Sequence, residues 1–195
     1  MKKLILILTG VLVLIGSASA ESRIFLSLGA NLIQPADAAY KDIYGSHVLY
    51  PEGALSIRTV GGLCVMGSYG QFVRNGTTPD LGLATKSKQG YFTAGLGYLQ
   101  RVSSFLCVQG GAGVASISFR EEALDTVVSG SKMGFMMEAG AYLMPEAQNF
   151  FLGLKVGYLS ANVSDVSTEI AGAQPVKLGG FKVCVCVGIQ LFGSH

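Results

Sequence analysis

The side chains best suited to acid–base or nucleophilic chemistry are few in this chain. It contains two histidines, His47 and His195, and His195 is the last residue. His47 follows Ser46 and comes five residues after Asp42, so the residue types of a serine nucleophile, a base and an orienting acid occur together. Adjacency in sequence does not create the geometry of a triad, and no recognised enzyme motif surrounds these residues. We therefore expect no catalytic site and regard His47 as an exposed loop side chain.

The second reactive set consists of four cysteines: Cys64, Cys107, Cys184 and Cys186. Cys184 and Cys186 are two residues apart, which places them on one face of one strand and disfavours a bond between them. Cys64 and Cys107 fall on predicted strands that are two steps apart, about 9–10 Å at roughly 4.8 Å per step, beyond the reach of about 7 Å between Cα atoms. We expect four unpaired thiols that act as small fillers. We also expect no metal site, since there are only two histidines, and no cofactor.

Charged residues are rare inside the apolar segments of the chain. The ones that lie well inside are Arg58, Glu138, Lys155 and Lys182. Alternation places them on the face that otherwise carries small side chains. We expect Glu138 and Lys155 to form an opposite-charge cross-strand pair, with Arg58 as a further polar group of the same interior.

The elements that position these residues are eight stretches in which large apolar side chains alternate with Gly, Ser, Ala, Cys or Gln. A period of two indicates strands, because successive side chains point to opposite faces. The predicted strands cover residues 23–32, 52–60, 63–73, 90–100, 105–119, 133–144, 149–161 and 180–192. Their lengths bracket the 9–11 residues or so that a tilted strand needs to cross a bilayer.

The connections between these strands alternate in length. The short ones are Gly61-Gly62, 101–104 and 145–148, and the long polar ones are 33–51, 74–89, 120–132 and 162–179. This alternation is typical of an up-and-down barrel whose two ends differ. The sequence therefore predicts an all-β fold: an eight-stranded antiparallel transmembrane β-barrel.

Two registers can be predicted from the turns. A four-residue turn at 145–148 would pair residues of the sixth and seventh strands whose numbers add up to 293. This register places Glu138 opposite Lys155. A strict two-residue turn at Gly61-Gly62 would put Ile57 and Val65 on opposite faces. We therefore expect an odd-length turn or a bulge there, and the 101–104 turn has the same parity problem.

The distribution of charge decides which face meets lipid. A soluble lipocalin-like barrel also alternates, but it needs a solvated exterior, which so few charges inside the strands cannot supply. We therefore expect a lipid-facing apolar exterior and a narrow, packed lumen lined by glycines. Aromatic residues expected to ring the exterior near strand ends are Phe92, Tyr98, Phe135, Phe150, Tyr158 and Phe181.

The first twenty residues have the pattern of an export signal. Lys2 and Lys3 precede an apolar run, and Ala18-Ser19-Ala20 forms a small-residue cleavage site. We expect a signal peptide at 1–20, a barrel at 21–192 and a short tail at 193–195. Residues 1–20 hold two of the 14 basic side chains and none of the 12 acidic ones, so the remainder is balanced in charge. This balance argues against a nucleic-acid partner, which would require a basic surface.

With its signal, paired strands and a last strand that ends at Phe192, the chain resembles the small eight-stranded bacterial outer-membrane barrels of the OmpX/Ail type and the membrane domain of OmpA. The resemblance implies a location in the outer membrane, assembly by the barrel-assembly machinery and long loops that face outward. It implies a structural or surface-interaction role, with an extracellular ligand or host surface as partner. The alternatives are a narrow OmpW-like channel for small solutes and, less favoured, a lipid-modifying enzyme. The loop residues expected to make contacts are Tyr40, Tyr44, His47, Tyr50, Arg74, Lys86, Lys88, Arg120, Glu121 and Glu122.

Overall fold

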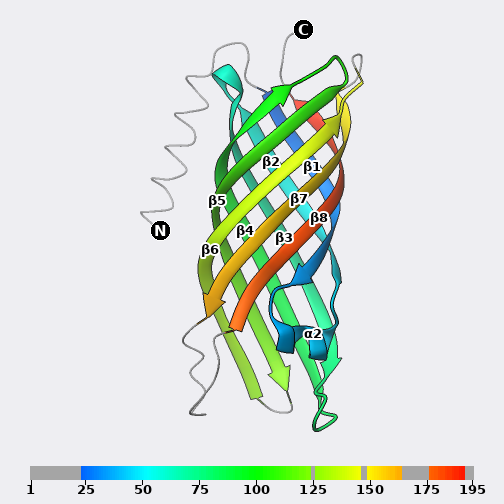
Figure 1. The fold of residues 1–195 in the computed structure, drawn as a ribbon, viewed down its shortest axis with the longest axis vertical. Coiled ribbons are helices and arrows are strands. Elements are labelled where there is room, and N and C mark those ends of the chain that lie inside the picture. Colours follow the sequence, from blue (N-terminus) through cyan, green and yellow to red (C-terminus); the bar gives the residue numbers. More distant parts are fainter. Residues whose placement is uncertain (1–22, 124–125, 146–148, 164–175, 192–195) are drawn as a thin grey trace.

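Eight antiparallel strands form a closed barrel in chain order, with β1 hydrogen-bonded to β8 (Figure 1). The structure is a computed structural model that describes residues 23–123, 126–145, 149–163 and 176–191. The strands are β1 Arg23–Pro35, β2 Val48–Arg58, β3 Leu63–Thr77, β4 Ala84–Arg101, β5 Leu106–Ala123, β6 Thr126–Leu143, β7 Phe150–Val163 and β8 Val176–Leu191. The predicted fold class, an all-antiparallel up-and-down barrel, is confirmed.

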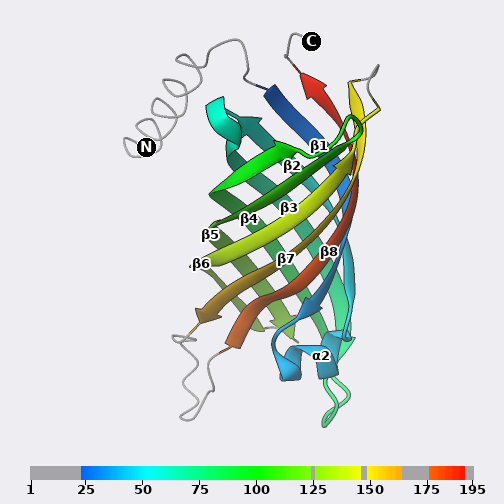
Figure 2. The same ribbon diagram turned by 45° about the horizontal axis from the view of Figure 1, so that its top comes forward.

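The two ends of the barrel differ. The turn end, at the top of Figure 1, carries the connections β2–β3, β4–β5 and β6–β7, and the first of these contains the short helix η1 Val60–Gly62. The loop end, at the bottom, carries the helix α2 Ala38–Tyr44 between β1 and β2. Figure 2 shows the strands inclined to the barrel axis as they follow one another round the wall. Among the described residues, no helix has the length and apolar character to cross a membrane.

The strands extend further toward the loop end than the sequence predicted. β3 continues to Thr77 and β4 begins at Ala84, so the predicted loop 74–89 is mostly strand. β5 continues to Ala123 and β6 begins at Thr126, so the predicted loop 120–132 is also mostly strand. The prediction was wrong because most side chains in these segments are polar, so the apolar alternation on which it relied stops before the strands do.

The registers were predicted with mixed success. Ile57 pairs with Val65, so the connection between β2 and β3 has odd length, as expected, and Gly61 and Gly62 take positive φ values of 73° and 88° within it. For β6 and β7 the prediction was wrong by two residues, because Glu138 lies opposite Gly157, and Lys155 lies opposite Gly140. The last pair of this ladder is Leu143 with Leu152, so the turn is longer than assumed. A shift of two leaves every side chain on its predicted face.

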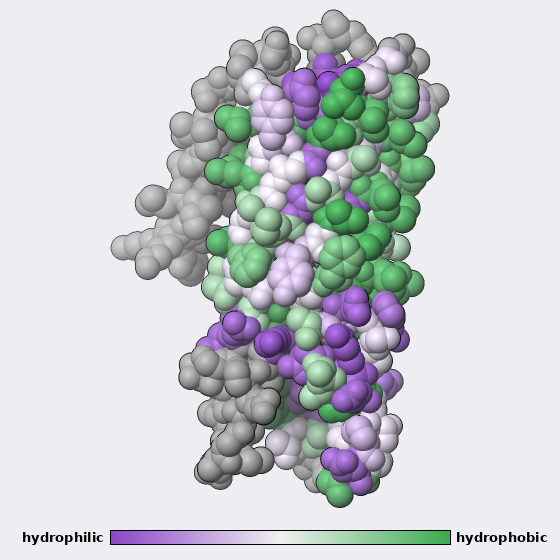
Figure 3. Space-filling view, in the orientation of Figure 1, coloured by the Kyte–Doolittle hydropathy of each residue, from purple (hydrophilic) through white to green (hydrophobic). Residues whose placement is uncertain are grey.

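An apolar belt surrounds the part of the barrel nearest the turn end. Figure 3 shows hydrophobic side chains gathered on the upper part of the visible face, most densely on its right, with more hydrophilic ones below them toward the loop end. The aromatic residues predicted for the exterior are exposed on it: Phe92, Tyr98, Phe135, Phe150, Tyr158 and Phe181. Tyr69 and Phe105, which the prediction omitted, are exposed there too. An exterior of this kind suits lipid, with aromatic rings at its borders.

Side chains fill the interior in two apolar clusters. The cluster toward the loop end contains Tyr40 and Tyr44 of α2 together with wall residues such as Tyr50, Phe72 and Tyr91. The cluster toward the turn end contains aromatic residues and all four cysteines: Phe25, Cys64, Leu99, Cys107, Tyr142, Met144, Phe151, Cys184 and Cys186. A narrow eight-stranded barrel has room for this only where small residues line the wall.

Glycine at position 97 tests this close packing. A Cβ at Gly97 would lie 2.5 Å from the carbonyl oxygen of Gly110 and 3.1 Å from the sulfur of Met66, whereas a Cβ at Gly110, on the outer face, would meet nothing within 4 Å. We expect Gly97→Ala to lower the free energy of unfolding by about 1–3 kcal/mol through overpacking. Gly110→Ala is the matched control on the next strand and should be neutral or stabilising by up to about 1 kcal/mol. Urea unfolding of the refolded variants measures both, and equal effects would contradict a tightly packed lumen.

Candidate functional site: a charged layer and an aromatic cap in the lumen

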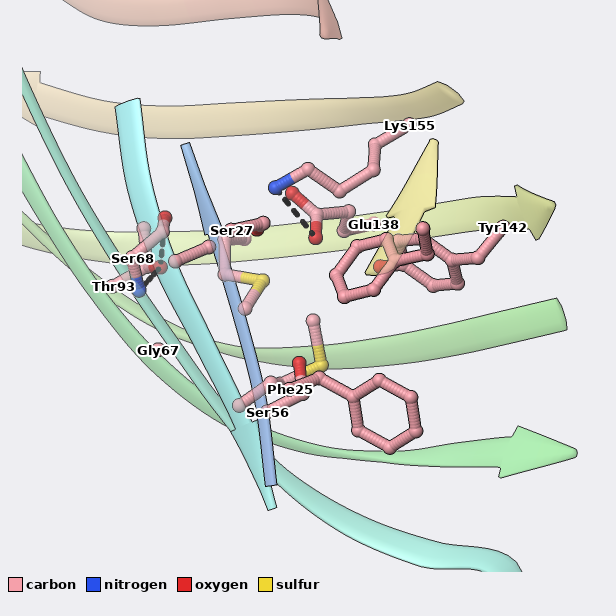
Figure 4. A pocket seen from close by; sticks show the side chains of 13 residues that line it. Phe25, Ser27, Ser56, Gly67, Ser68, Thr93, Glu138, Tyr142 and Lys155 are labelled. Atoms are coloured by element: carbon pink, nitrogen blue, oxygen red, sulfur yellow. Dashed lines mark hydrogen bonds and ion pairs between the residues drawn. The ribbon is translucent and has the colours of Figure 1, made fainter. Parts of the chain in front are cut away.

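Four charged side chains meet in the middle of the lumen, and we call them the lumen charge layer: Glu52, Glu138, Lys155 and Lys182. Lys155 Nζ lies 2.7 Å from Glu52 Oε1 and 3.7 Å from Glu138 Oε1. Lys182 Nζ lies 2.9 Å from Glu52 Oε2 and 2.7 Å from Glu138 Oε2. Figure 4 shows Lys155 and Glu138 reaching toward each other from separate strands. Each ammonium group therefore lies between two carboxylates, and the layer is neutral as a whole.

The layer joins walls on opposite sides of the barrel. Glu52 comes from β2 and Glu138 from β6, four strands away in a ring of eight, while Lys155 and Lys182 come from β7 and β8. The side chains of both lysines are no more than 3% exposed. Removing four charges from water is costly, so the arrangement is stable only because every charge has partners at hydrogen-bonding distance. The layer acts as a cross-brace inside the barrel.

Sequence reasoning placed Arg58 with these residues and overlooked Glu52. The structure brings Glu138 and Lys155 together but places Arg58 at the turn end, where its Nε donates to the carbonyl oxygen of Leu99 on β4 at 3.1 Å. Glu52 was overlooked because the second strand was predicted to begin there, whereas β2 begins at Val48. The sequence does contain a signal for Glu52: it lies an even number of residues before Arg58, so the two side chains point to the same face of the strand.

Between this layer and the loop end lie five aromatic side chains, which we call the aromatic cap: Tyr40, Tyr44, Tyr50, Phe72 and Tyr91. The ring centroids of Tyr50, Phe72 and Tyr91 are 5.7–5.8 Å apart, and those of Tyr40 and Tyr44 are 4.6 Å apart. All five side chains are buried. The prediction that Tyr40, Tyr44 and Tyr50 make exposed loop contacts is therefore wrong.

The helix α2 directs two of these rings inward. Tyr40 and Tyr44 are four residues apart and so share one face of the helix. Asp37 caps its first turn by accepting a hydrogen bond from the Tyr40 amide at 3.0 Å, and its second oxygen accepts one from the Lys177 amide at 3.1 Å. Burial raises the pKa of Tyr40 to about 12. Asp37 therefore ties the helix to β8 and keeps its aromatic face over the lumen.

The other residues predicted as loop contacts lie on strands, apart from His47. Lys86, Lys88 and Arg120 are exposed on the outer wall near the loop end, and Glu122 accepts a hydrogen bond from Arg120 Nε at 2.8 Å. Glu121 is half-buried on the lumen side of β5.

His47 is exposed in the connection between α2 and β2. Its carbonyl oxygen accepts a hydrogen bond from Arg74 Nη2 at 3.0 Å, and its Nδ1 lies 2.9 Å from Ser46 Oγ. Within the described ranges no hydrogen bond or ion pair joins Asp42 to His47, so the third member of a triad is not in place beside the first two. These contacts hold the loop around His47 against β3 and indicate a structural role for this residue.

The four cysteines are buried and unpaired, in agreement with the prediction that they act as fillers. Cys184 and Cys186 follow each other on the lumen face of β8, where a Cβ at Gly29 would lie 2.6 Å from Cys184 Sγ. In the part of the chain that the structure describes, no three of the residue types His, Cys, Asp and Glu are grouped to hold a metal ion.

Beside the lumen charge layer there is little free space. A cavity of about 10 Å³ lies beside the charge layer, lined by residues that include Ser56, Thr93, Glu138 and Lys155 (Figure 4). That volume corresponds to about one water molecule. Buried side chains of the two apolar clusters pack the lumen on either side of the charge layer.

Comparisons with known proteins agree with this architecture. No protein-family model and no curated protein matches the sequence. Among solved structures, OprG of Pseudomonas aeruginosa is similar with a TM-score of 0.68 at 14% identity over 90% of this chain and 99% of that chain. The attachment invasion locus protein Ail of Yersinia pestis, in complex with the heparin analogue sucrose octasulfate, has a TM-score of 0.60 at 16% identity over 88% and 99%. Neisserial surface protein A has a TM-score of 0.51 at 11% identity over 90% and 99%.

At identities of 11–16%, the likeness to these proteins concerns the fold and not the function. Each of these proteins is covered almost completely by this chain, so the likeness extends over the whole barrel and not over a fragment. Together with the closed eight-stranded topology and the apolar belt, it shows that the chain has the fold of the small eight-stranded outer-membrane β-barrels.

Proposed function

We propose that the protein is an integral barrel of the bacterial outer membrane with a structural or surface-interaction role, and that its loop end carries the interaction. The apolar belt with its aromatic residues supports insertion into a bilayer. In this proposal the turn end faces the periplasm, the loop end faces outward, and outer-membrane lipid and the barrel-assembly machinery are partners. An export signal at 1–20, which lies outside the described residues, would bring the chain to this compartment.

The observation that carries the proposal is the filled lumen. The aromatic cap, the lumen charge layer and the cluster around the cysteines follow one another along the axis, and the cavity beside the charge layer is only about 10 Å³. A conducting channel needs a continuous wet path, and a neutral, fully paired charge layer opposes one. The packing favours a scaffold over the OmpW-like channel.

Exposed polar groups at the loop end are the means of interaction in this proposal. Lys86, Lys88 and Arg120 project from the outer wall beyond the apolar belt, and the loop that contains His47 lies nearby through its bond to Arg74. Basic side chains suit an anionic partner, such as a sulfated polysaccharide of a host surface. Ail, which shares the fold, was solved with a sulfated sugar.

Two measurements test the proposal. Purified, refolded protein in planar bilayers is expected to give no reproducible channels, and steady conductance would overturn the scaffold role in favour of a channel. Bacteria that display the protein are expected to bind a heparin-coated surface more strongly than cells without it. The triple variant Lys86→Gln, Lys88→Gln, Arg120→Gln should lose most of this gain, while the variant Lys41→Gln, in α2, serves as the matched control. Equal adhesion with and without the protein would contradict an interaction through this wall.

A further inference from the structure

Three arginines gather inside the turn end of the barrel, and we call them the arginine mouth: Arg23, Arg58 and Arg101. Arg23 on β1 and Arg58 on β2 are direct cross-strand partners. Residues opposed in this way share a face, with Cα atoms about 4.5–5.5 Å apart. They point to the lumen side, because Phe25, two residues after Arg23, and Ser56, two residues before Arg58, are buried. All three arginines are half-buried and so remain accessible from the turn end.

Arg101 joins the pair from β4. The side chain of Arg58 crosses β3 and donates to the carbonyl oxygen of Leu99, which lies two residues before Arg101 on the same face. Arg101 is the ladder partner of Cys107. All three guanidinium groups lie within electrostatic reach of the Cys107 thiol, so the three charges share one region of the turn end.

No carboxylate balances this cluster among the described residues. None of the ion pairs between two described residues involves an arginine of the mouth. Like charges directly opposite each other on a sheet are destabilising. In the middle of the lumen two carboxylates balance two lysines, whereas at the turn end no carboxylate of the described residues balances the three arginines.

Most of the donors in the mouth form no hydrogen bond to a described residue. A guanidinium group has five N–H donors. Arg58 uses Nε for Leu99, and Arg101 uses Nε for the carbonyl oxygen of Ser103 at 3.1 Å and Nη2 for that of Ser104. For Arg23 the structure shows no hydrogen bond to the described residues. The two anchored arginines are thus held in position by backbone groups, while their remaining N–H groups and those of Arg23 lack partners in the described parts of the chain.

We propose that the arginine mouth binds a phosphate group at the turn end of the barrel. A phosphate group presents several acceptor oxygens in a tetrahedron, so more than one guanidinium fork can hold it at once. Its negative charge relieves the repulsion between Arg23 and Arg58, which a single carboxylate does less completely. The group can belong to a phospholipid head of the inner leaflet or to free phosphate of the periplasm, and both have this chemistry. The site lies at the end opposite to the proposed interaction surface and does not depend on it.

Binding of inorganic phosphate to the refolded barrel in a phosphate-free detergent, followed by calorimetry, tests the site. Arg23→Gln and Arg58→Gln are each expected to weaken binding about tenfold, the loss of one charge-assisted hydrogen bond. Lys41→Gln removes a basic group from α2 at the other end and should change the affinity less than twofold. Arg23→Gln breaks no hydrogen bond to a described residue, so it keeps the test decisive if Arg58→Gln does not refold.

Native mass spectrometry with phosphatidylglycerol separates the two sources. Retention of the lipid by the wild type and its loss in Arg23→Gln, without measurable binding of inorganic phosphate, would assign the site to a lipid head. Binding of inorganic phosphate that depends on Arg23, without retention of lipid, would assign it to free phosphate. The proposal is overturned if neither probe binds, or if the variants bind both probes as the wild type does.

Discussion

Replacing Glu52 by Gln is expected to lower the free energy of unfolding by about 3–5 kcal/mol, the cost of breaking a buried ion pair from one side. Glu52 accepts one short hydrogen bond from each of Lys155 and Lys182, at 2.7 and 2.9 Å. Gln has nearly the same shape, so packing is retained, but two buried ammonium groups then share Glu138 alone. Urea unfolding in detergent micelles, read from the heat-modifiable mobility of the folded barrel on gels, measures the change. Lys155→Met should have a similar effect, because it leaves two carboxylates with one lysine.

Two further variants show whether charge balance is the cause. Glu122→Gln removes a carboxylate from an exposed pair with Arg120 and should change stability by less than about 1 kcal/mol. The double variant Glu52→Gln, Lys155→Met has one carboxylate and one lysine left in the layer, so it should lose less than the sum of the two single variants. Additive losses, or a Glu52→Gln barrel that unfolds at the wild-type urea concentration, would contradict the conclusion that the lumen charge layer stabilises the barrel by linking its opposite walls.

The alternation of side chains predicted the barrel and its faces, and the reason is the strict period of two. The register of β6 and β7 shows how robust this signal is. The prediction opposed Glu138 to Lys155, the structure opposes Glu138 to Gly157, and both side chains still point into the lumen, within 3.7 Å of each other. Whether a residue is at an even or an odd position in the strand decides which face its side chain points to. The length of the turn decides which residue lies opposite it, and apolar patterning does not determine that length.

Strand ends were not predictable from the same pattern. In the segment Lys86–Gln89, Ser87 and Gln89 are buried while Lys86 and Lys88 are exposed, so the alternation continues between two polar faces. A strand outside the lipid has no apolar face to reveal it, and its sequence looks like a loop. Glu52 was overlooked and Tyr50 was assigned to a loop because the second strand was predicted to begin at residue 52, whereas β2 begins at Val48.

Contacts across the lumen depend on closure of the barrel and on α2. Glu52 and Glu138 come from opposite walls, and the sequence contains no signal that brings them to one height. The helix α2 is seven residues long, too short for a clear helical period. Its one signal was the spacing of Tyr40 and Tyr44, four residues apart. The aromatic cap could therefore be found only with the folded chain.

Replacing Tyr50 by Ala is expected to lower the free energy of unfolding by about 3–5 kcal/mol, the range for removing a buried aromatic ring. Tyr50 is 2% exposed, its ring centroid lies 5.7 Å from those of Phe72 and Tyr91, and a Cβ at Gly70 would lie 2.5 Å from its ring. Three surfaces thus lose their contacts at once, and water gains a path toward Glu52 from the loop end. The same urea unfolding measurement records the loss.

Tyr50→Phe distinguishes the ring from its hydroxyl. The hydroxyl of Tyr50 is buried and has no hydrogen-bond partner among the described residues. An unpaired buried hydroxyl contributes nothing favourable, so its removal should leave stability unchanged or raise it by up to about 1 kcal/mol. If Tyr50→Phe were as destabilising as Tyr50→Ala, the hydroxyl and not the ring would hold the cap together, through a partner such as a bound water. The expected contrast between the two variants is the signature of a seal made by aromatic packing.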